Sequence, residues 1–296
     1  MNAPTKDDVW DAVVVGAGPG GSACAIKLAR KGRRVLIIEK ESFPRFAIGE
    51  SLLPFGNDAL HELGVYDQIA NGPFIRKSGA EFTVGSGAGH IKNWFRNNGS
   101  PKHDHAFQVE RAKFDKVLLD RASECGAEVL QPARATRIDT GGETDLATLS
   151  VSGPEGEQHI RARFLIDGTG RASLFARQLK LETEDLPLVK RVALYAHFTG
   201  VHRPEGKRAG NIILTRLDRG WFWFIPINET TTSVGLVVST REFQESGEKP
   251  EEFFRKTCEA HPDTNFRMKQ AHRCGEIHVT TDYTVRYRNN AGPRWL

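Results

Sequence analysis

Residues 11–41 read DAVVVGAGPGGSACAIKLARKGRRVLIIEKE, and their pattern predicts the class of fold. The apolar run 12–15 is short enough for a buried parallel strand, and it enters the glycine-rich sequence 16–21. Small and apolar residues at helical spacing follow. A second apolar run, 35–38, then ends in Glu39. A strand, a glycine turn, a helix, a second strand and an acid in this order predict a Rossmann-like dinucleotide-binding unit.

Each residue of the glycine turn has a physical task in such a unit. Gly16 permits the tight turn, Gly18 lets the backbone approach a pyrophosphate, and Gly21 lets the helix pack closely on the strand. Backbone N–H groups and the positive end of the helix hold the phosphates. Ala17 and Pro19 lie in the same turn, so we expect them at the cofactor site as well.

The end of the second predicted strand indicates which nucleotide is bound. Glu39 can accept hydrogen bonds from both hydroxyls of an adenosine ribose, which favours an unphosphorylated ribose over NADP. Lys40 follows it directly and is expected at the same site. The chain contains no second glycine fingerprint, which predicts one tightly held dinucleotide and leaves FAD and NAD open.

Composition excludes several other classes of protein. The chain has 296 residues, of which 39% are hydrophobic and 26% charged, as in an ordinary globular protein of two domains or one large one. Lys and Arg number 41 against 37 acids, a balance too even to predict nucleic-acid binding. No apolar run approaches the ~18 residues of a membrane span, and from its polar composition we expect the N-terminus not to be a signal peptide. We therefore expect a cytoplasmic protein.

Cysteine and histidine spacing gives no sign of a metal site. The four cysteines lie far apart without a C-x-x-C pair, so we expect reduced thiols. The sequence 103–105, His-Asp-His, stands beside Pro101 and Asn98-Gly99 and is predicted to be a surface loop rather than a set of ligands.

Three later segments decide which dinucleotide is bound. They are FPRFAIGESLLP (43–54), an amphipathic helix followed by a strand (109–130), and RFLIDGTGRASLFARQL (163–179). Their order after the dinucleotide unit resembles that of the FAD-dependent monooxygenase superfamily. The resemblance implies FAD as the cofactor and a Rossmann-like FAD-binding domain of the p-hydroxybenzoate hydroxylase type.

The same resemblance implies contacts along the length of the flavin. Arg45 and Ser51 would lie near the pyrophosphate and the ring, Arg111 on the ribityl side, and Asp167 with Gly168 beside the pyrophosphate. Taken alone, Arg111 could equally be a solvated helix residue, and Asp167 a turn former.

The rest of the chain predicts a second, β-rich domain. Alternating apolar patterns and turn signals predict strands within 80–89, 135–164, 191–200, 211–217, 220–227 and 232–239. A pair of helices is expected at 250–262 and 264–274. We therefore expect an FAD-binding α/β domain, 1–77 and 107–180, interleaved with an antiparallel β-sheet substrate domain, 78–106 and 181–296.

Residues 220–227, GWFWFIPI, place four consecutive aromatic rings before a proline. By themselves they are typical of a buried strand that ends at Pro226. The stretch also resembles the W-x-W-x-I-P segment of flavin-dependent halogenases, with Trp221 and Trp223 at the tryptophan positions. FIRKSGAEF, 74–82, is similar to the K-x-G-x-x-F segment of that family, which places Lys77 at its catalytic lysine.

The halogenase resemblance implies a specific chemistry. Reduced FAD, delivered by a separate flavin reductase, would react with O₂ and a halide ion to give hypohalous acid. Lys77 would hold that species by hydrogen bonding or as a haloamine and pass it to a small-molecule aromatic or carrier-bound substrate. Trp221 and Trp223 would separate flavin from substrate and exclude water.

Other interpretations stay open at this point. Lys77 could be an ordinary surface cation. Geranylgeranyl reductases of the same superfamily carry Y-x-W-x-F-P at the aromatic segment. Trp221 and Ile225 at the differing positions favour the halogenase without excluding a reductase or another monooxygenase.

The last residues, AGPRWL (291–296), resemble the start of a strand that leads, in these flavoproteins, to a G-D-A-x-x-x-x-D-P-x-x-x-x-G segment with further flavin contacts. We therefore expect the chain to lack the C-terminal region of the family and to bind FAD weakly, and a non-catalytic fragment stays open as an alternative.

Overall fold

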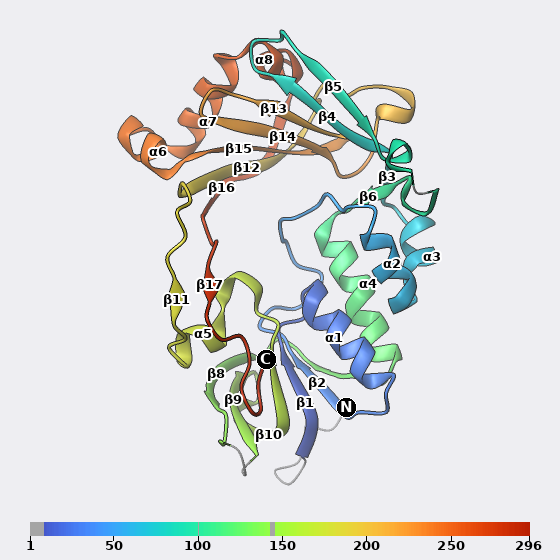
Figure 1. Ribbon diagram of the computed structural model, residues 1–296, viewed down its shortest axis with the longest axis vertical. Coiled ribbons are helices and arrows are strands. Elements are labelled where there is room, and N and C mark those ends of the chain that lie inside the picture. The colour runs from blue at the N-terminus through green and yellow to red at the C-terminus, as the bar shows by residue number, and fades with distance from the viewer. Residues whose placement is uncertain (1–8, 100, 143–145) are drawn as a thin grey trace.

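The computed structural model describes residues 9–99, 101–142 and 146–296, which form two units, each built on a large sheet (Figure 1). The first sheet contains β1 (Val9–Val15), β2 (Val35–Ile38), β7 (Glu128–Leu130), β8 (Arg134–Asp139), β9 (Ala147–Gly153) and β10 (Gly156–Asp167). The second contains β4 (Gly79–Val84), β5 (His90–Trp94), β12 (Arg191–Thr199), β13 (Ile212–Arg216), β14 (Gly220–Pro226), β15 (Thr231–Ser239) and β16 (His272–Thr281). Their spatial orders are β7-β2-β1-β10-β9-β8 and β16-β12-β15-β14-β13-β4-β5.

The first unit is the predicted dinucleotide fold. β1 lies parallel to both β2 and β10, and its buried residues are Trp10 and the apolar run after Asp11. Helices α1 (Pro19–Ala29) and α4 (Arg111–Glu124) pack together on one face, where Val14 and Ile37 meet Ile26. Val13 and the opposite face are covered by α5 (Leu174–Gln178). The predicted Rossmann-like α/β class is therefore confirmed.

Short elements connect the two units. Helices α2 (Gly56–Leu63) and α3 (Tyr66–Ala70) lead to β3 (Ile75–Lys77), which pairs antiparallel with β6 (Ala106–Gln108) between the two large sheets (Figure 1). The remaining elements are β11 (Thr183–Glu184), β17 (Arg286–Tyr287), η1 (Phe95–Asn98), η2 (Pro101–His103), η3 (Gly170–Ala172) and η4 (Gly206–Arg208).

The second sheet carries a helical layer on the face turned away from the first unit (Figure 1). That layer consists of α6 (Thr240–Ser246), α7 (Pro250–Glu259) and α8 (Pro262–Met268). Phe222 and Phe224 of β14 pack beneath α7, where the Phe222 and Phe254 ring centroids are 5.4 Å apart. Because side chains alternate along a strand, Trp221 and Trp223 face the opposite way, toward the first unit.

One strand pair departs from the antiparallel arrangement. β4 lies parallel to β13, with Ala80 opposite Ile212, whereas β13, β14, β15, β12 and β16 form antiparallel neighbours. β4 belongs to the segment that enters the second unit from β3 and returns through β6, so it joins the sheet from outside the consecutive hairpins.

The prediction of a second helix over 264–274 is wrong in its C-terminal part. The helix, α8, ends at Met268, and His272 already belongs to β16. β16 forms a long antiparallel ladder with the edge of β12. Pairing with an open sheet edge satisfies many backbone groups at once and overrides a weak helical preference.

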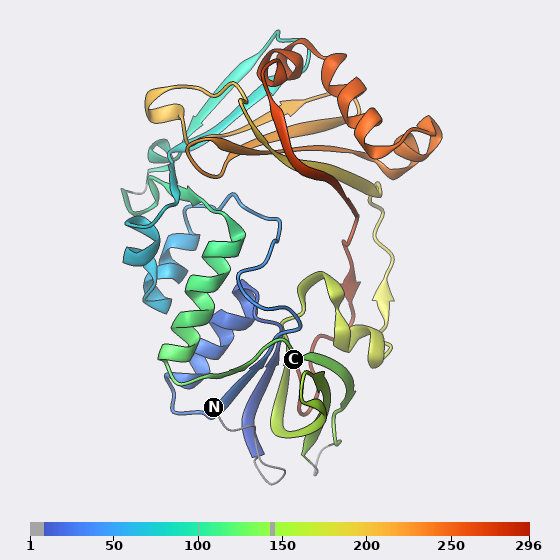
Figure 2. The same cartoon turned by 180° about the vertical axis from the view of Figure 1, so that it is seen from behind.

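The final residues return to the first unit (Figures 1 and 2). The backbone N–H of Leu165 donates to the carbonyl of Arg294 at 2.8 Å, and Leu296 donates to Leu165 at 3.0 Å. Trp295 is buried beside Phe175. Residues 294–296, assigned from the sequence to the second domain, therefore lie beside β10 of the first sheet and begin the expected strand there.

Helices of the described residues are all too short or too polar to cross a bilayer.

Candidate cofactor and active site

A cavity of about 1660 Å³ lies between the two units and gathers most of the predicted site residues. Its walls come from the glycine turn, the ends of β2 and β10, the start of α4, the segment 43–54, and the face of the second sheet that carries the tryptophans. The predicted residues that line it are Gly16, Gly18, Pro19, Gly21, Glu39, Lys40, Arg45, Ser51, Arg111, Asp167, Gly168, Trp221 and Trp223. Ala17 and Lys77 lie behind its walls.

Three glycines of the first turn are needed for different physical reasons. Gly16 has φ +104°, and a Cβ on it would lie 2.4 Å from the carbonyl oxygen of Gly168. A Cβ on Gly21 would lie 2.0 Å from the carbonyl oxygen of Gly16. A Cβ on Gly18 would meet only the guanidinium of Arg45, at 3.6 Å. The fold itself therefore requires Gly16 and Gly21, whereas Gly18 leaves room for a ligand.

Glu39 is buried at the tip of β2 and accepts two backbone hydrogen bonds. Its Oε2 accepts from the N–H of Ala17 at 2.8 Å, and its Oε1 from the N–H of Glu41 at 3.0 Å. Ala17 thus fixes Glu39 rather than lining the cavity. Each carboxylate oxygen keeps acceptor capacity, so the pair of ribose hydroxyls expected here fits this carboxylate.

Two arginines converge on one buried carboxylate beside the glycine turn. Asp115 of α4 accepts from Arg111 at 2.7 and 2.9 Å and from Arg45 at 3.1 Å. Arg111 also donates to the carbonyl of Ile48, so it is not a solvated helix residue. Two guanidiniums share one carboxylate and leave a net positive charge near Gly18, which suits a pyrophosphate.

The segment 43–54, hereafter the strap, is also held from the second sheet. Glu50 is buried, and its Oε1 lies 2.7 Å from Nε2 of His197 on β12. The ring of Phe46 stacks on His278 of β16, with centroids 4.8 Å apart. These contacts cannot be predicted from the sequence, because nothing in the local pattern around residues 197 and 278 links them to the strap.

Lys77 stands at the end of β3 and is only 2% exposed. Its Nζ donates to Ser51 Oγ at 2.8 Å and to the carbonyl of Leu52 at 2.9 Å. The ring of Phe95 lies 5.3 Å from the same nitrogen. Burial lowers the pKa of Lys77 to about 8 from 10.5. The interpretation as a surface cation is therefore wrong, and the amine lies one hydrogen bond behind Ser51.

The tryptophans form the opposite wall of the cavity. The ring of Trp223 lies flat on Gly235 of β15, where a Cβ would come within 2.1 Å of the ring. Its Nε1 donates to Ser233 Oγ at 3.3 Å. The ring of Trp221 lies 5.0 Å from the guanidinium of Arg191. β14 therefore buries two phenylalanines in the core and presents two indoles to the cavity.

Asp167 is a turn former as well as a residue of the cavity wall. Its carboxylate accepts from the backbone and hydroxyl of Thr169 at 2.9 and 2.5 Å, and from the N–H of Phe175 at 2.8 Å. Its side chain is thus committed to the turn that begins α5. Gly168 allows this turn to pack against Gly16.

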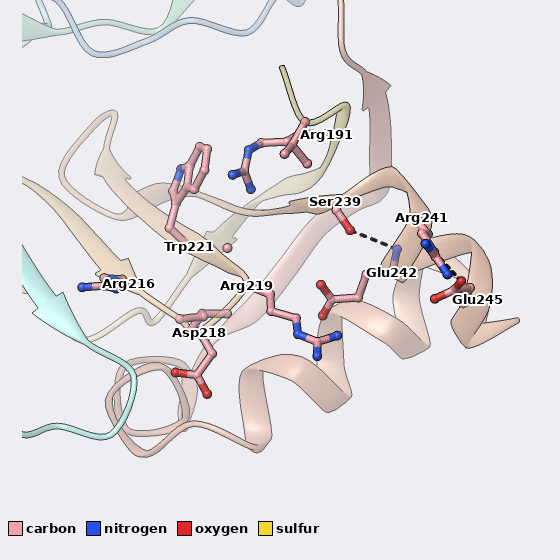
Figure 3. Close-up of a pocket in the computed structure, with 12 residues that line it drawn as sticks. Arg191, Arg216, Asp218, Arg219, Trp221, Ser239, Arg241, Glu242 and Glu245 are labelled. Carbon is pink, nitrogen blue, oxygen red and sulfur yellow. Dashed lines mark hydrogen bonds and ion pairs between the residues drawn. The ribbon is translucent and has the colours of Figure 1, made fainter. Parts of the chain in front are cut away.

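A smaller cleft of about 640 Å³ adjoins the cavity at the β13–β14 turn and the start of α6 (Figure 3). Arg191 and Trp221 line both spaces. No cluster of three metal-ligating side chains occurs in the described ranges. His105, expected in a surface loop, is instead buried against Tyr66. It directly precedes β6, whose residues are all buried.

Comparison with known proteins agrees with this geometry. The FAD binding domain family matches residues 9–290. A tryptophan 2-halogenase of Chondromyces crocatus is 33% identical over 99% of this chain and 55% of its own length. A 1H-pyrrole-2-carbonyl-[peptidyl-carrier protein] brominase of Pseudoalteromonas luteoviolacea is 30% identical over 97% of this chain and 69% of its own.

The fold recurs in the myxobacterial chondrochloren halogenase CndH, with a TM-score of 0.90 and 31% identity over 97% of this chain and 67% of that one. The chain thus spans about half to two thirds of the length of these relatives. Its cofactor is FAD, for which the open Gly18, the buried Glu39 and the arginine pair are suited. The chain belongs to the flavin-dependent halogenase family.

Proposed function

We propose that this chain forms the part of a halogenase that binds FAD, oxidises a halide and passes the halogen to Lys77. The observation that carries the proposal is the buried amine of Lys77, joined through Ser51 to the wall of the cavity. When bound, FAD supplies the two-electron chemistry by which O₂ oxidises chloride or bromide to hypohalous acid.

The site residues divide the binding of FAD between them. Gly18 leaves space for the pyrophosphate at the N-terminus of α1, where free N–H groups point at the ligand. Arg45 and Arg111 offset the negative charge, and Glu39 accepts the ribose hydroxyls. The strap and the tryptophan wall would hold the ring end of the cofactor.

Lys77 receives the oxidised halogen. An amine with a pKa of about 8 is neutral in roughly a tenth of molecules at pH 7, which makes the lone pair available. That nitrogen either holds hypohalous acid by a hydrogen bond or attacks its halogen. In the second case an N–halogen bond forms, the oxygen–halogen bond breaks, and water leaves with the amine proton. Transfer to an aromatic carbon then returns the substrate's proton to the amine.

The remaining walls keep the reaction dry. Trp221, Trp223 and Ile225 line the cavity as a continuous apolar surface on β14. Excluding water protects hypohalous acid from side reactions and prevents direct hydroxylation of the substrate. We propose an electron-rich aromatic substrate, free or carried by a protein, and a separate flavin reductase that supplies reduced FAD.

Lys77→Met tests the proposal. The substitution keeps the length of the side chain and removes the nucleophilic nitrogen. With chemically reduced FAD, O₂, bromide and a phenol or indole probe, we expect loss of brominated product with peroxide formation nearly unchanged. Lys77→Arg is expected to fail as well, because a planar, permanently charged guanidinium cannot act as a neutral amine. Lys92→Met, at an exposed lysine of β5, is the matched control.

Two further assays, one without O₂ and one without bromide, distinguish a halogenase from other flavin enzymes. A reductase would consume reduced flavin on an alkene without O₂, and a hydroxylase would turn over without bromide. Brominated product from Lys77→Met at the parent rate would overturn the proposal.

A further inference from the structure

The guanidinium of Arg191 stands at the junction of the flavin cavity and the smaller cleft. Arg191 opens β12 and is half-buried, and its side chain forms no hydrogen bond or ion pair with the residues that the structure places. Its one protein partner is the ring of Trp221, 5.0 Å away (Figure 3). A guanidinium carries five N–H donors in one plane, so this side chain is free to bind an acceptor supplied by a ligand.

The cleft around it carries charge of both signs with a cationic excess. Four arginines and three carboxylates line it (Arg191, Arg216, Arg219, Arg241, Asp218, Glu242 and Glu245). Arg241 is neutralised by Glu245, 2.6 Å away. Arg216 and Arg219 have no ion pair within the described ranges. The cleft therefore has one more arginine than carboxylates, and Arg191 has no ion pair among the described residues.

The dimensions of the cleft fit an organic molecule rather than a single ion. A space of about 640 Å³ falls within the range of sites that enclose small ligands. A halide would occupy a small part of it and could use only a few of the donors of Arg191. A carboxylate can accept two parallel N–H bonds from a guanidinium, and an aromatic ring can stack on an indole such as Trp221.

We propose that this cleft binds an aromatic carboxylate, with the carboxylate on Arg191 and the ring against Trp221, and leads it into the flavin cavity. The inference builds on the proposed function by naming the class of aromatic substrate. Because Arg191 and Trp221 belong to both spaces, a ring held there already lies at the boundary of the cavity in which the halogen is generated.

A matched pair of probes tests the recognition of the carboxylate. Calorimetric titration of the FAD-loaded protein with 4-hydroxybenzoate and with 4-hydroxybenzamide compares an acid with a neutral molecule of similar shape. We expect the acid to bind at least about tenfold more tightly, a difference of about 1.4 kcal/mol. Equal affinities for the two probes would overturn the proposal.

Variants locate the binding. Arg191→Met removes the donors and keeps much of the apolar length, so we expect the preference for the acid to disappear. Arg241→Met, in the same cleft but neutralised by Glu245 in the parent, should preserve it. Retention of the preference in Arg191→Met, or its loss in Arg241→Met alone, would place the carboxylate elsewhere.

A bromide arm distinguishes the two possible anions. Bromide in large molar excess over the acid should leave the affinity for 4-hydroxybenzoate unchanged if the cleft takes the organic acid. Competition between them would instead make Arg191 a halide site and contradict the proposal. None of these measurements requires turnover, so failure of Lys77 chemistry and failure of the cleft are separate results.

Discussion

At the scale of single residues, the glycine turn separates requirements of the fold from requirements of the ligand. The Cβ of a Gly18→Val variant would meet only Arg45, at 3.6 Å, whereas the rest of the side chain would occupy the pyrophosphate site. We expect FAD affinity to fall by at least about a hundredfold with little change in the stability of the protein without FAD. Fluorescence titration and chemical denaturation measure the two quantities. FAD binding at the parent affinity would contradict the assignment of the turn.

Lys77 gives a second prediction at this scale, in the pH dependence of stability. Its pKa is about 8 in the folded protein and 10.5 ordinarily. Between these values the unfolded chain binds more protons, so its contribution to the free energy of unfolding rises with pH across this window. Urea denaturation from pH 7 to 10.5 should show this rise in the parent relative to Lys77→Met. Halogen transfer should also increase as pH rises through about 8. Parallel stability curves for the two proteins would show that the amine is not desolvated.

The sequence predicts residue roles well where one local motif sets them. The positions of Gly16, Gly21 and Glu39 follow from the fingerprint, since strand, turn and helix fix their surroundings. The contacts of Lys77 could not be derived in this way. Its partners, Ser51 and Leu52, belong to the strap, and only tertiary packing brings the strap to β3.

At the scale of elements, β14 shows how one strand serves a core and a cavity. Gly235 is what lets Trp223 lie flat on the neighbouring strand, because a Cβ there would come within 2.1 Å of the ring. Gly235→Ala should push the indole toward the cavity and reduce the free energy of unfolding by about 1–3 kcal/mol. It should also alter the visible spectrum of bound FAD. Gly56→Ala, where a Cβ meets nothing within 4 Å, is the control. An unchanged spectrum would mean that the Trp223 ring does not approach the flavin.

Sequence patterns predict some strands and helices of this chain better than others. The alternation in residues 220–227 predicts β14 because its own residues carry the signal. The helical pattern over 264–274 failed after Met268, because the edge of β12 outside that window provides the hydrogen bonds for β16. Arg191 was also missed, since one arginine at the start of a strand has no local signature.

At the scale of the whole molecule, FAD should couple the two units, because its cavity is lined by both sheets. Ligand at 100 times its dissociation constant adds about 2.7 kcal/mol to the free energy of unfolding. We expect a single, higher melting transition with FAD, and little shift in Gly18→Val. Differential scanning calorimetry measures both. A shift confined to one of two separate transitions would show that FAD contacts only the first unit.

The return of residues 294–296 to β10 has a consequence for synthesis. β4 pairs with β13, β12 with β16, and Leu165 with Trp295, so neither sheet can be completed before residues 272–296 have been translated. Pairings between residues far apart in sequence form slowly. The nascent polypeptide therefore exposes unpaired strand edges while it is being translated. The yield of folded protein in the cell should depend on chaperones and on slow growth at low temperature.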